Sequence, residues 1–327
     1  MKGLILVNDD YELNVAKQII NDKKLNMDAL IMKMKDLNEE ELKGYGVLIG
    51  YSAKVDRDDL TRLARNNIKL YITRSTGFNH IDIEAAKALN IKIANIPGYS
   101  PNAIAELTLA LALDLNRLVS DQAYRFYQRD FKRPTKLFKE IRDCTVGILG
   151  VGSIGAVSAR YFNAMGAKVI GYNRSIKHEL KDIVKYLPMQ EVIDLSDILL
   201  LHLPYHKNEN HYLINKDSLK NAKSNLIIVN TARGELVNLA DIIDLIKQDK
   251  LMGYGADVFE NEQHYIGKKV PTYDDPIINE ALNMFPRIIF TAHMGAATNR
   301  AVETMIKMAI ENFQTFAETS TVINEIY

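Results

Sequence analysis

A glycine-rich turn between a strand and a helix is the feature that most constrains the fold of this chain. Gly150, Gly152 and Gly155 follow the apolar run TVGIL and open the segment SIGAVSARYFNAMG, which begins at Ser153 and Ile154. In such a unit the first glycine allows a tight turn, the second lets the backbone approach a pyrophosphate, and the third lets helix and strand pack closely. The phosphates then meet the positive end of the helix and its free N–H groups. A turn without a ligand is the alternative, but the strand before it and the helix after it favour a dinucleotide site.

Short apolar runs recur along the whole chain and predict two parallel-sheet domains. The first hundred residues alternate the runs KGLILVN, GVLIG, IKLYITR and IKIANI with helical patterns. A second series runs from TVGIL through KVIGY, DILLLHLP, NLIIVN and MGYGADVF to RIIFTAH. Strands that are almost wholly apolar are buried on both faces, and their alternation with helices is typical of parallel sheets. We therefore expect an α/β fold with two doubly wound parallel-sheet domains.

The two series are separated by a loop, and a final helix follows the second. Ser100 and Pro101 are suited to begin the long apolar helix PNAIAELTLALALDL, as a cap and as a first helical residue. The amphipathic segment 299–318 comes after the second series and is expected to pack back on the first domain, which predicts a hinge and a cleft between the domains. The expected organisation is a Rossmann cofactor domain, residues 101–297, inserted in a flavodoxin-like substrate domain, residues 1–100 and 298–327.

Composition argues against polyanionic and membrane partners. The chain has 41 basic and 41 acidic residues, so it has no net charge to attract nucleic acid or an anionic membrane surface. No stretch approaches the roughly 20 apolar residues of a membrane span. Cys144 is the one cysteine, which excludes an internal disulfide and fits a reducing compartment, so we expect a cytoplasmic protein. The sequence offers no cluster of metal ligands, and no metal is expected.

The end of the second strand of the later series indicates which dinucleotide binds. The run KVIGY is followed by Asn173, Arg174 and Ser175, where a ribose-binding site usually has an acid. An aspartate would accept bonds from the ribose hydroxyls and repel a 2′-phosphate, whereas asparagine removes the repulsion and the next two residues add a cation and a donor. NADP(H) is therefore the favoured cofactor, and NAD(H) with a weakened ribose contact is the alternative. Further residues expected to line the cofactor site are His202, Pro204, Thr231, Ala232 and Asp257.

Three ionisable residues follow three different strands of the second series. Arg233 comes directly after NLIIVN, Glu262 after the run that ends in ADVF, and His293 after RIIF. Ligands of open α/β sheets bind beyond the carboxyl ends of the strands, so these side chains should converge on one edge. Any one of the seven histidines could be structural, but only His293 combines a strand end with a partner acid at another strand end.

The chain resembles the D-isomer-specific 2-hydroxyacid dehydrogenases. The resemblance rests on RSTGFNHID, YSPNAIAE, GVGSIG, NTARGELV, ADVFENE and TAH, and it covers essentially the whole chain. The segment PTYDDPIINEALNMFPR between Glu262 and His293 is similar to the D-lactate and D-2-hydroxyisocaproate dehydrogenase branch. RSTGFNHID and YNRS are similar to the vancomycin-resistance D-lactate dehydrogenase, and this resemblance implies NADPH.

The resemblance implies a chemical role for each of the three ionisable residues. Arg233 would bind the carboxylate of a 2-oxo acid and polarise its carbonyl, in the bidentate geometry that suits a guanidinium. His293 as imidazolium would give a proton to the carbonyl oxygen while nicotinamide gives hydride to C2. Glu262 would orient the imidazole and raise its pKa, and Asp257 would meet the nicotinamide amide or support the site. The family also implies a D-2-hydroxy acid product and a homodimer, for which the helix PNAIAELTLALALDL is apolar enough.

The substrate pocket is expected to draw on the first domain as well. By resemblance, Thr76 and Gly77 would offer N–H groups to the carboxylate and Tyr99 would line the side-chain pocket. The loop GYSAKV, with Tyr51 and Ser52, is the expected specificity loop, although Tyr51 fits an ordinary loop aromatic equally well.

The residues after His293 depart from the family pattern. Many members of the lactate branch have an aromatic pair there, where this chain has Met294, Gly295, Ala296 and Ala297, and Ala292 replaces the proline before the histidine. Small residues leave room in a pocket, so branched or aromatic 2-oxo acids are favoured as substrates. The alternatives are an NADH-dependent D-lactate dehydrogenase and, more remotely, a dinucleotide-sensing protein without catalysis.

Overall fold

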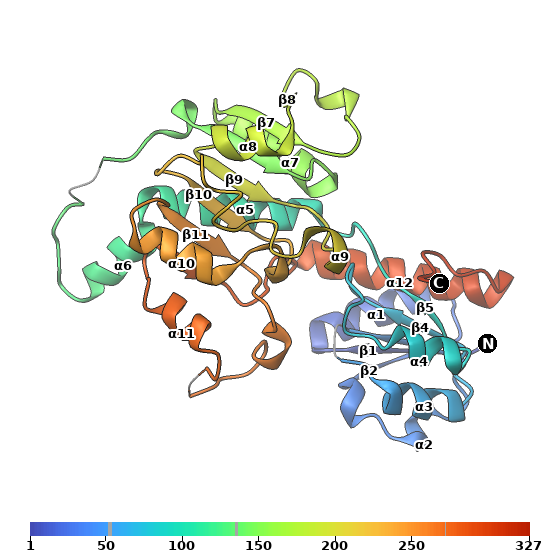
Figure 1. Cartoon of the computed structure of the whole chain (residues 1–327). Helices are drawn as coiled ribbons and strands as arrows, with labels where there is room; N and C mark the ends of the chain where they lie inside the picture. The colour runs from blue at the N-terminus through green and yellow to red at the C-terminus, as the bar shows by residue number, and fades with distance from the viewer. Residues whose placement is uncertain (52–53, 135–136, 272) are drawn as a thin grey trace. The chain divides into compact units, whose positions relative to one another are not determined.

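The computed structural model describes residues 1–51, 54–134, 137–271 and 273–327. The chain forms two compact units, each with its own sheet and helices (Figure 1). Unit 1 comprises Met1–Ser100 and Ala297–Tyr327, and unit 2 comprises Pro101–Ala296. Unit 2 is therefore continuous in sequence, whereas unit 1 is made from both ends of the chain.

Unit 1 is built on a five-stranded parallel sheet in the order β2-β1-β3-β4-β5. Its strands are β1 (Gly3–Val7), β2 (Met27–Ile31), β3 (Val47–Gly50), β4 (Leu70–Thr73) and β5 (Lys92–Ala94). Every residue of β1, β3 and β4 is buried, as expected for strands that helices cover on both sides. This strand order is the flavodoxin-like form of the doubly wound fold.

Helices pack on both faces of the unit 1 sheet. They are α1 (Asp10–Asp22), α2 (Glu39–Leu42), α3 (Arg57–Arg65), α4 (Ile83–Ala88) and α12 (Asn299–Thr319). Ile20 of α1 and Ile310 and Phe313 of α12 belong to the core on one face. Leu60 and Leu63 of α3 belong to the core on the other face. The late helix α12 thus completes the core that the first strands of the chain begin.

Unit 2 is built on a seven-stranded parallel sheet in the order β12-β11-β10-β9-β6-β7-β8. Its strands are β6 (Thr145–Leu149), β7 (Lys168–Tyr172), β8 (Val184–Tyr186), β9 (Ile198–Leu201), β10 (Ile227–Asn230), β11 (Gly253–Ala256) and β12 (Ile288–Phe290). The strand order reverses at β6, which lies between β7 and β9. A reversal of this kind marks the crevice in which open α/β sheets bind their ligands.

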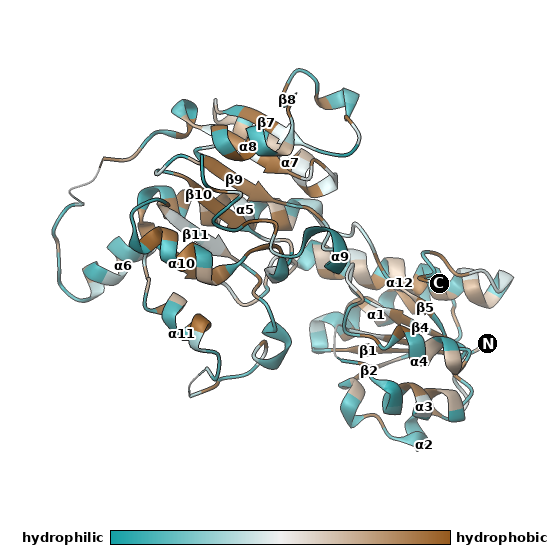
Figure 2. Ribbon diagram, viewed as in Figure 1, coloured by the Kyte–Doolittle hydropathy of each residue, from teal (hydrophilic) through white to brown (hydrophobic). Residues whose placement is uncertain are grey.

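Helices also cover both faces of the unit 2 sheet. They are α5 (Pro101–Arg117), α6 (Val119–Tyr127), α7 (Ser153–Ala164), α8 (Met189–Leu195), α9 (Lys207–Asn210), α10 (Leu239–Lys247) and α11 (Pro276–Leu282). Leu111 of α5 and Phe162 of α7 share one core, and Val192 of α8 and Ile242 of α10 share the other. Figure 2 shows the strands between these helices as the most hydrophobic part of the unit.

Polar side chains fix the first turns of several helices. Asp9, Asn238 and Thr298 accept hydrogen bonds from backbone N–H groups at the beginnings of α1, α10 and α12. Asp275 caps α11, and Pro276 takes its first position, where a missing N–H group costs nothing.

The short 3-10 helices are η1 (Met34–Asp36), η2 (Ile141–Asp143), η3 (His178–Leu180), η4 (Gly234–Leu236) and η5 (Glu262–His264).

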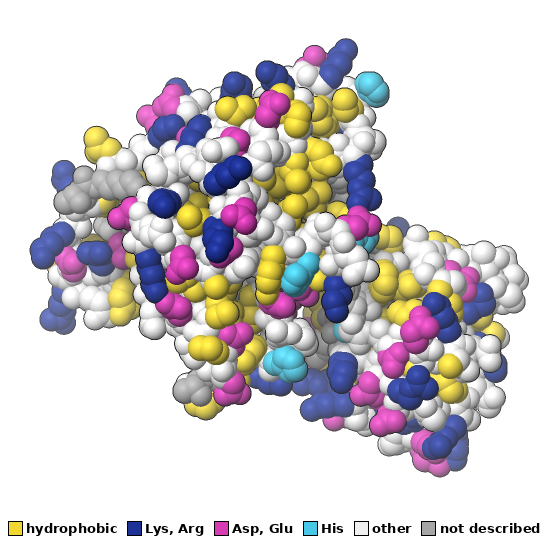
Figure 3. Space-filling view, viewed as in Figure 1, with side chains coloured by type: hydrophobic (Ala, Val, Ile, Leu, Met, Phe, Trp, Pro, Cys, Tyr) yellow, Lys and Arg dark blue, Asp and Glu magenta, His cyan; other side chains and the backbone are white. Residues whose placement is uncertain are grey.

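The observed architecture confirms the predicted fold class. Both sheets are parallel and doubly wound, and the unit with the glycine-rich turn is inserted in the flavodoxin-like one. In the part of the chain that the structure describes, no helix has both the length and the apolar character needed to cross a membrane. Figure 3 shows basic and acidic side chains interspersed over the visible face, in keeping with the zero net charge.

Candidate active site

The three glycines after β6 have three different surroundings. Gly150 has a φ of +97°, and a Cβ atom there would lie 2.7 Å from the backbone of His202. A Cβ atom on Gly155 would lie 2.2 Å from the carbonyl oxygen of Gly150. A Cβ atom on Gly152, in contrast, would meet no described atom within 4 Å. The first glycine is thus required by the turn and the third by packing, whereas the second borders open space.

The beginning of α7 has the features of a pyrophosphate site. No described side chain caps this helix, so the N–H groups of its first turn, at Ser153 and Ile154, have no side-chain acceptor, and the neighbouring Gly152 borders open space. His202 bonds to Ser158 of α7 through Nε2 (3.0 Å), while its Nδ1 is buried and has no partner among the described residues. Burial lowers the pKa of His202 to about 4, so the ring is neutral at pH 7. The open glycine and the uncapped N–H groups fit the phosphates of a dinucleotide.

The predicted ribose-binding residues follow β7. The Asn173 side-chain amide donates to the carbonyl oxygen of Ser175 (2.7 Å), which holds this loop in a tight turn. Arg174 forms an ion pair with Glu209 of α9, at 2.7 Å between Nη2 and Oε2. This partner was not predicted from the sequence, because Glu209 is 35 residues further along the chain.

His293 and Glu262 form a hydrogen-bonded pair at the carboxyl edge of the sheet. Nδ1 of His293 lies 2.6 Å from Oε1 of Glu262. The hydrogen bond to the carboxylate raises the pKa of His293, and burial of the ring opposes this only in part. The histidine side chain is 45% exposed, so Nε2 is left for a ligand. A histidine held in this way can carry a proton at neutral pH and present it to a substrate.

Backbone contacts hold Glu262 in place. Its second carboxylate oxygen, Oε2, accepts a hydrogen bond from the N–H group of Phe259 at 3.2 Å. The turn between these two residues passes through Asn261, which has a φ of +61°. Tyr212 donates a hydrogen bond of 2.7 Å to the neighbouring Glu260, and this bond raises the tyrosine pKa to about 12. A Cβ atom on Gly234 would lie 2.2 Å from the backbone of Phe259, so the loops after β10 and β11 touch.

Hydrogen bonds to Asp257 fix the turn that carries His293. It is buried, and its Oδ1 accepts hydrogen bonds from the Thr291 hydroxyl (2.5 Å) and the Met294 N–H group (2.9 Å). Oδ2 accepts from the N–H group of Gly295 at 2.8 Å. The backbone N–H of His293, which has a φ of +50°, donates to the Asp257 carbonyl oxygen. These contacts favour the supporting role over direct contact with a nicotinamide amide.

Arg233 lies at the end of β10 without a carboxylate partner among the described residues. Its guanidinium donates to the carbonyl oxygen of Ala232, and its own carbonyl oxygen accepts from Asn230, which is buried. The Thr231 hydroxyl pairs with Thr108 of α5 at 2.8 Å, so it serves the packing of that helix. Arg233 is therefore placed by its neighbours while its charge remains available to an anion.

Three comparisons with known proteins indicate the same protein family. The sequence model of the D-isomer specific 2-hydroxyacid dehydrogenase NAD-binding domain matches residues 109–295. A D-2-hydroxyacid dehydrogenase (NAD(+)) from Clostridioides difficile is 31% identical over 100% of both chains. The chain belongs to the D-isomer-specific 2-hydroxyacid dehydrogenase family. An aromatic 2-oxoacid reductase from Clostridium sporogenes is 33% identical over 86% of each chain. The crystal structure of a D-lactate dehydrogenase from Treponema pallidum matches over 100% of both chains, with 29% identity and a TM-score of 0.90.

Membership of the family confirms the enzyme class that the sequence predicts. The protein is a D-2-hydroxyacid dehydrogenase, an oxidoreductase that acts on 2-oxo and 2-hydroxy acids and has an NAD-binding domain. The described residues include no group of three or more histidine, cysteine or acidic side chains that could hold a metal ion.

The predicted substrate-binding residues of this dehydrogenase in unit 1 follow β3, β4 and β5. The N–H groups of Thr76 and Gly77 reach no acceptor among the residues described, while the two carbonyl oxygens accept from Asn95 and Ser75. Tyr99 is half-buried against the core that α1 and α12 share. The ring of Tyr51 lies under Arg74, and Ser52 falls outside the described residues.

Sequence reasoning missed a buried ion pair next to this loop. Arg74 is wholly buried, and its guanidinium donates to Glu12 at 2.8 Å and to the carbonyl oxygen of Leu6 at 3.1 Å. Two of its nitrogens, Nε and Nη1, have no described hydrogen-bond partner. Arg74 opens the motif RSTGFNHID, and an arginine directly after an apolar strand was the available signal.

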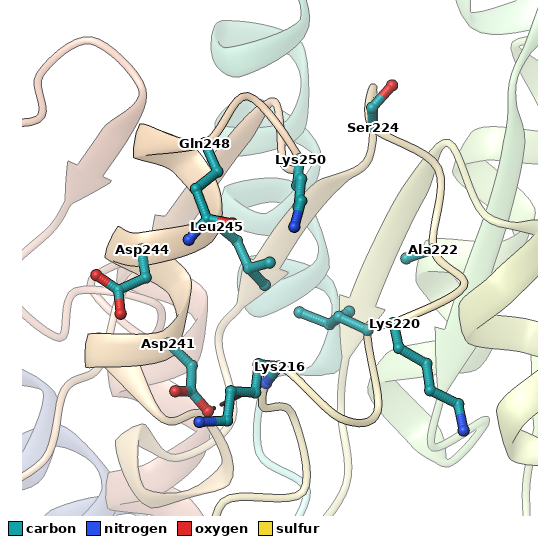
Figure 4. A pocket seen from close by; sticks show the side chains of 10 residues that line it. Lys216, Lys220, Ala222, Ser224, Asp241, Asp244, Leu245, Gln248 and Lys250 are labelled. Atoms are coloured by element: carbon teal, nitrogen blue, oxygen red, sulfur yellow. Dashed lines mark hydrogen bonds between the residues drawn. The ribbon is translucent and has the colours of Figure 1, made fainter.

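A hollow beside α10 is not the active site. It has a volume of about 500 Å³, and Figure 4 shows that lysine and aspartate side chains surround it. Its lining residues, among them Lys216, Lys220, Asp241 and Lys250, belong to α10, to the residues just after it and to the segment that precedes β10. Neither Arg233 nor Glu262 nor His293 lines this hollow.

Proposed function

We propose that this dehydrogenase works mainly as a reductase of branched or aromatic 2-oxo acids and favours NADPH. The observation that carries the catalytic part is the 2.6 Å contact between His293 and Glu262, beside an arginine without a carboxylate partner among the described residues. A proton donor and an anion-binding group thus belong to the same edge of the unit 2 sheet.

In this proposal Arg233 binds the substrate carboxylate and His293 donates the proton. The guanidinium presents two parallel N–H groups to the carboxylate, which fixes the direction of the neighbouring carbonyl. When bound, the nicotinamide of the cofactor supplies the hydride for C2. Nε2 of His293 gives its proton to the carbonyl oxygen, and Glu262 stabilises the imidazolium before the transfer. In unit 1, we assign the N–H groups of Thr76 and Gly77 to the carboxylate and Tyr99 and Tyr51 to the side-chain pocket.

The preference for large substrates rests on the residues that follow His293. Gly295 is buried beside Asp257, where a Cβ atom would lie 3.1 Å from Oδ2, and Ala296 and Ala297 follow it. This turn adds little bulk near the proton donor. The similarity to an aromatic 2-oxoacid reductase favours the same class of substrate, whereas the similarity to D-lactate dehydrogenases favours lactate and its 2-oxo acid, pyruvate.

The preference for NADPH rests on the residues that follow β7. Asn173 adds no negative charge where a 2′-phosphate would lie, and Arg174 is 76% exposed at the same strand end. The C. difficile relative is named for NAD(+), so NADH is the alternative to be tested. We assign the remaining contacts of the dinucleotide to the glycine-rich turn, to Ser153 and Ile154, and to the residues His202, Pro204, Thr231 and Ala232.

The first test compares initial rates with NADPH and NADH, each against pyruvate, 2-oxoisocaproate and phenylpyruvate. We expect the highest kcat/KM with NADPH and one of the two larger acids, and a D-2-hydroxy acid as the product on a chiral column. Faster turnover with NADH would overturn the cofactor preference. Faster turnover with pyruvate would overturn the substrate preference, and the two results are independent.

We also propose that the enzyme is a homodimer that pairs through α6. The apolar residues of α5, which the sequence favoured as the contact, largely pack inside unit 2. The exposed apolar side chains are instead Tyr124, Phe126, Tyr127 and Phe131, on and just after α6. A cluster of this kind is typical of a protein interface. Light scattering should give twice the 37.0 kDa chain mass, and the Phe126→Glu, Tyr127→Glu double variant should give one chain mass.

A further inference from the structure

The Arg174–Glu209 ion pair joins two loops that lie on either side of the glycine-rich turn. Arg174 follows β7 and Glu209 lies in α9, which follows β9. Because β6 lies between these two strands, the pair passes over the carboxyl end of β6, where the strand order reverses. The adenosine half of a dinucleotide binds at this point of a doubly wound sheet.

The helix that carries Glu209 is fixed by its own hydrogen bonds. The side-chain oxygen of Asn210 accepts from the N–H group of His206 at 2.7 Å, and its amide donates to the carbonyl oxygen of Pro204 at 2.8 Å. These bonds tie the last residue of the short helix back to the loop that leads into it. Glu209 is thus presented to Arg174 by a closed loop rather than by a free chain.

The pair is exposed and can open. The side chains of Arg174 and Glu209 are 76% and 59% exposed, and ion pairs between exposed side chains contribute little to stability. A 2′-phosphate carries more charge than one carboxylate and offers more acceptor oxygens to a guanidinium. Binding of NADPH would still require Arg174 to leave Glu209, and would place the phosphate near a second negative charge. Binding of NADH, which has a 2′-hydroxyl in place of the phosphate, requires neither the opening of the pair nor a phosphate near Glu209.

We propose that Glu209 is a specificity-determining residue that competes with the 2′-phosphate for Arg174. The pair lowers the affinity for NADPH and leaves the affinity for NADH almost unchanged, so the site accepts both cofactors instead of excluding one. This inference rests on the proposed preference for NADPH, and it assigns the limit of that preference to one carboxylate.

The test measures dissociation constants for NADPH and NADH by the fluorescence of the bound nicotinamide. The chain has no tryptophan, so protein fluorescence interferes little. Glu209→Gln removes the charge and keeps the shape. We expect the dissociation constant for NADPH to fall by up to about fivefold, the change that corresponds to an exposed ion pair at the upper end of the usual range, and that for NADH to change less than twofold. Arg174→Gln should raise the constant for NADPH by about tenfold and leave that for NADH unchanged.

The matched control is Glu179→Gln. Glu179 is an exposed acid in η3, five positions beyond Arg174, and it forms no ion pair with another described residue. If this substitution lowers the NADPH constant as much as Glu209→Gln does, a general effect of charge replaces the proposed competition. An unchanged or higher NADPH constant in Glu209→Gln would also overturn the inference, because Glu209 would then orient Arg174 for the phosphate.

Turnover separates this inference from the proposed function. A fivefold shift in the NADPH constant without turnover of any 2-oxo acid would support the role of Glu209 and overturn the assigned reaction. Turnover with NADPH, without a shift of the NADPH constant in Glu209→Gln, would support the assigned reaction and overturn the role of Glu209. If the unaltered protein binds neither dinucleotide, both proposals are wrong.

Discussion

Asp197 and Arg233, two charged residues at opposite edges of the unit 2 sheet, have opposite surroundings. At the amino edge, Asp197 is buried and accepts hydrogen bonds from the Thr145 N–H group and from the side chains of Asn225, Lys139 and Lys223. Burial alone would raise its pKa, but these four donors hold the pKa well below its usual range. At the carboxyl edge, in contrast, Arg233 has no described carboxylate partner.

Charges that maintain the fold are thereby distinguished from charges that serve a ligand. A buried charged group whose hydrogen bonds are all made within the protein contributes to stability, and it has no hydrogen-bonding capacity left for a substrate. A polar group that is left without a protein partner costs free energy unless a ligand completes it. Substitutions at the carboxyl edge should therefore change catalysis, and substitutions at the amino edge should change stability.

The largest effect is expected from His293→Ala. Without the proton donor, kcat for reduction should fall by about 10³-fold, while the dissociation constant of the cofactor stays within twofold. Stopped-flow and steady-state rates would measure the first, and fluorescence titration the second. A variant that keeps more than a tenth of the activity would show that another group supplies the proton.

A smaller loss is expected from Arg233→Lys. Lysine keeps the charge but loses the two parallel N–H groups, so kcat/KM should fall by about 10²-fold, mainly through a higher KM for the 2-oxo acid. Arg287→Lys is the matched control at the amino edge, where Arg287 binds Asp249 at 2.7 Å. Equal losses in the two variants would mean that the contrast between the edges does not hold.

Glu262→Gln should change the pH dependence more than the maximal rate. The carboxylate raises the pKa of His293, so in the unaltered enzyme the proton is retained to a higher pH than in an ordinary histidine. Reduction needs this proton, and the rate therefore falls as the pH rises through the pKa. In the variant this fall should move to lower pH, with a loss of about tenfold at pH 8. Identical pH profiles would show that Glu262 does not act on the proton.

The smallest effect on activity is expected from Asp197→Asn. The amide cannot accept all the bonds that the carboxylate accepts, so the free energy of unfolding should fall by about 1–3 kcal/mol. The kcat of the folded fraction should stay unchanged, because Asp197 lies at the amino edge. Urea unfolding and activity at low temperature would measure the two quantities. A clear loss of kcat would connect the two edges and contradict the comparison.

The sequence predicts the fold because each local signal agrees with the others. The apolar runs, the helix start at Pro101 and the spacing of Gly150, Gly152 and Gly155 are all local patterns, and each marks an element without reference to distant residues. The ends of the parallel strands then locate Arg233, Glu262 and His293 on one edge.

The partners of individual side chains are less predictable because they depend on packing between distant segments. Arg74 pairs with Glu12 across 62 residues, and Thr231 pairs with Thr108 across 123. Arg174 similarly meets an acid from a four-residue helix. No periodicity encodes these contacts, so the sequence alone left the exact role of each residue open.

The insertion of unit 2 has a consequence for synthesis on the ribosome. Phe313 of α12 lies against β1, where a Cβ atom on Gly3 would come within 2.6 Å of its ring. Strand β1 therefore lacks the helix α12 that covers it until about 300 further residues have been made, whereas unit 2 is complete earlier. Domains often fold in the order of translation, but here the segment made first is the last to be enclosed. A chain released before residue 299 would thus contain all of unit 2 and a unit 1 sheet that α1 alone covers on this face, which leaves apolar surface exposed to chaperones.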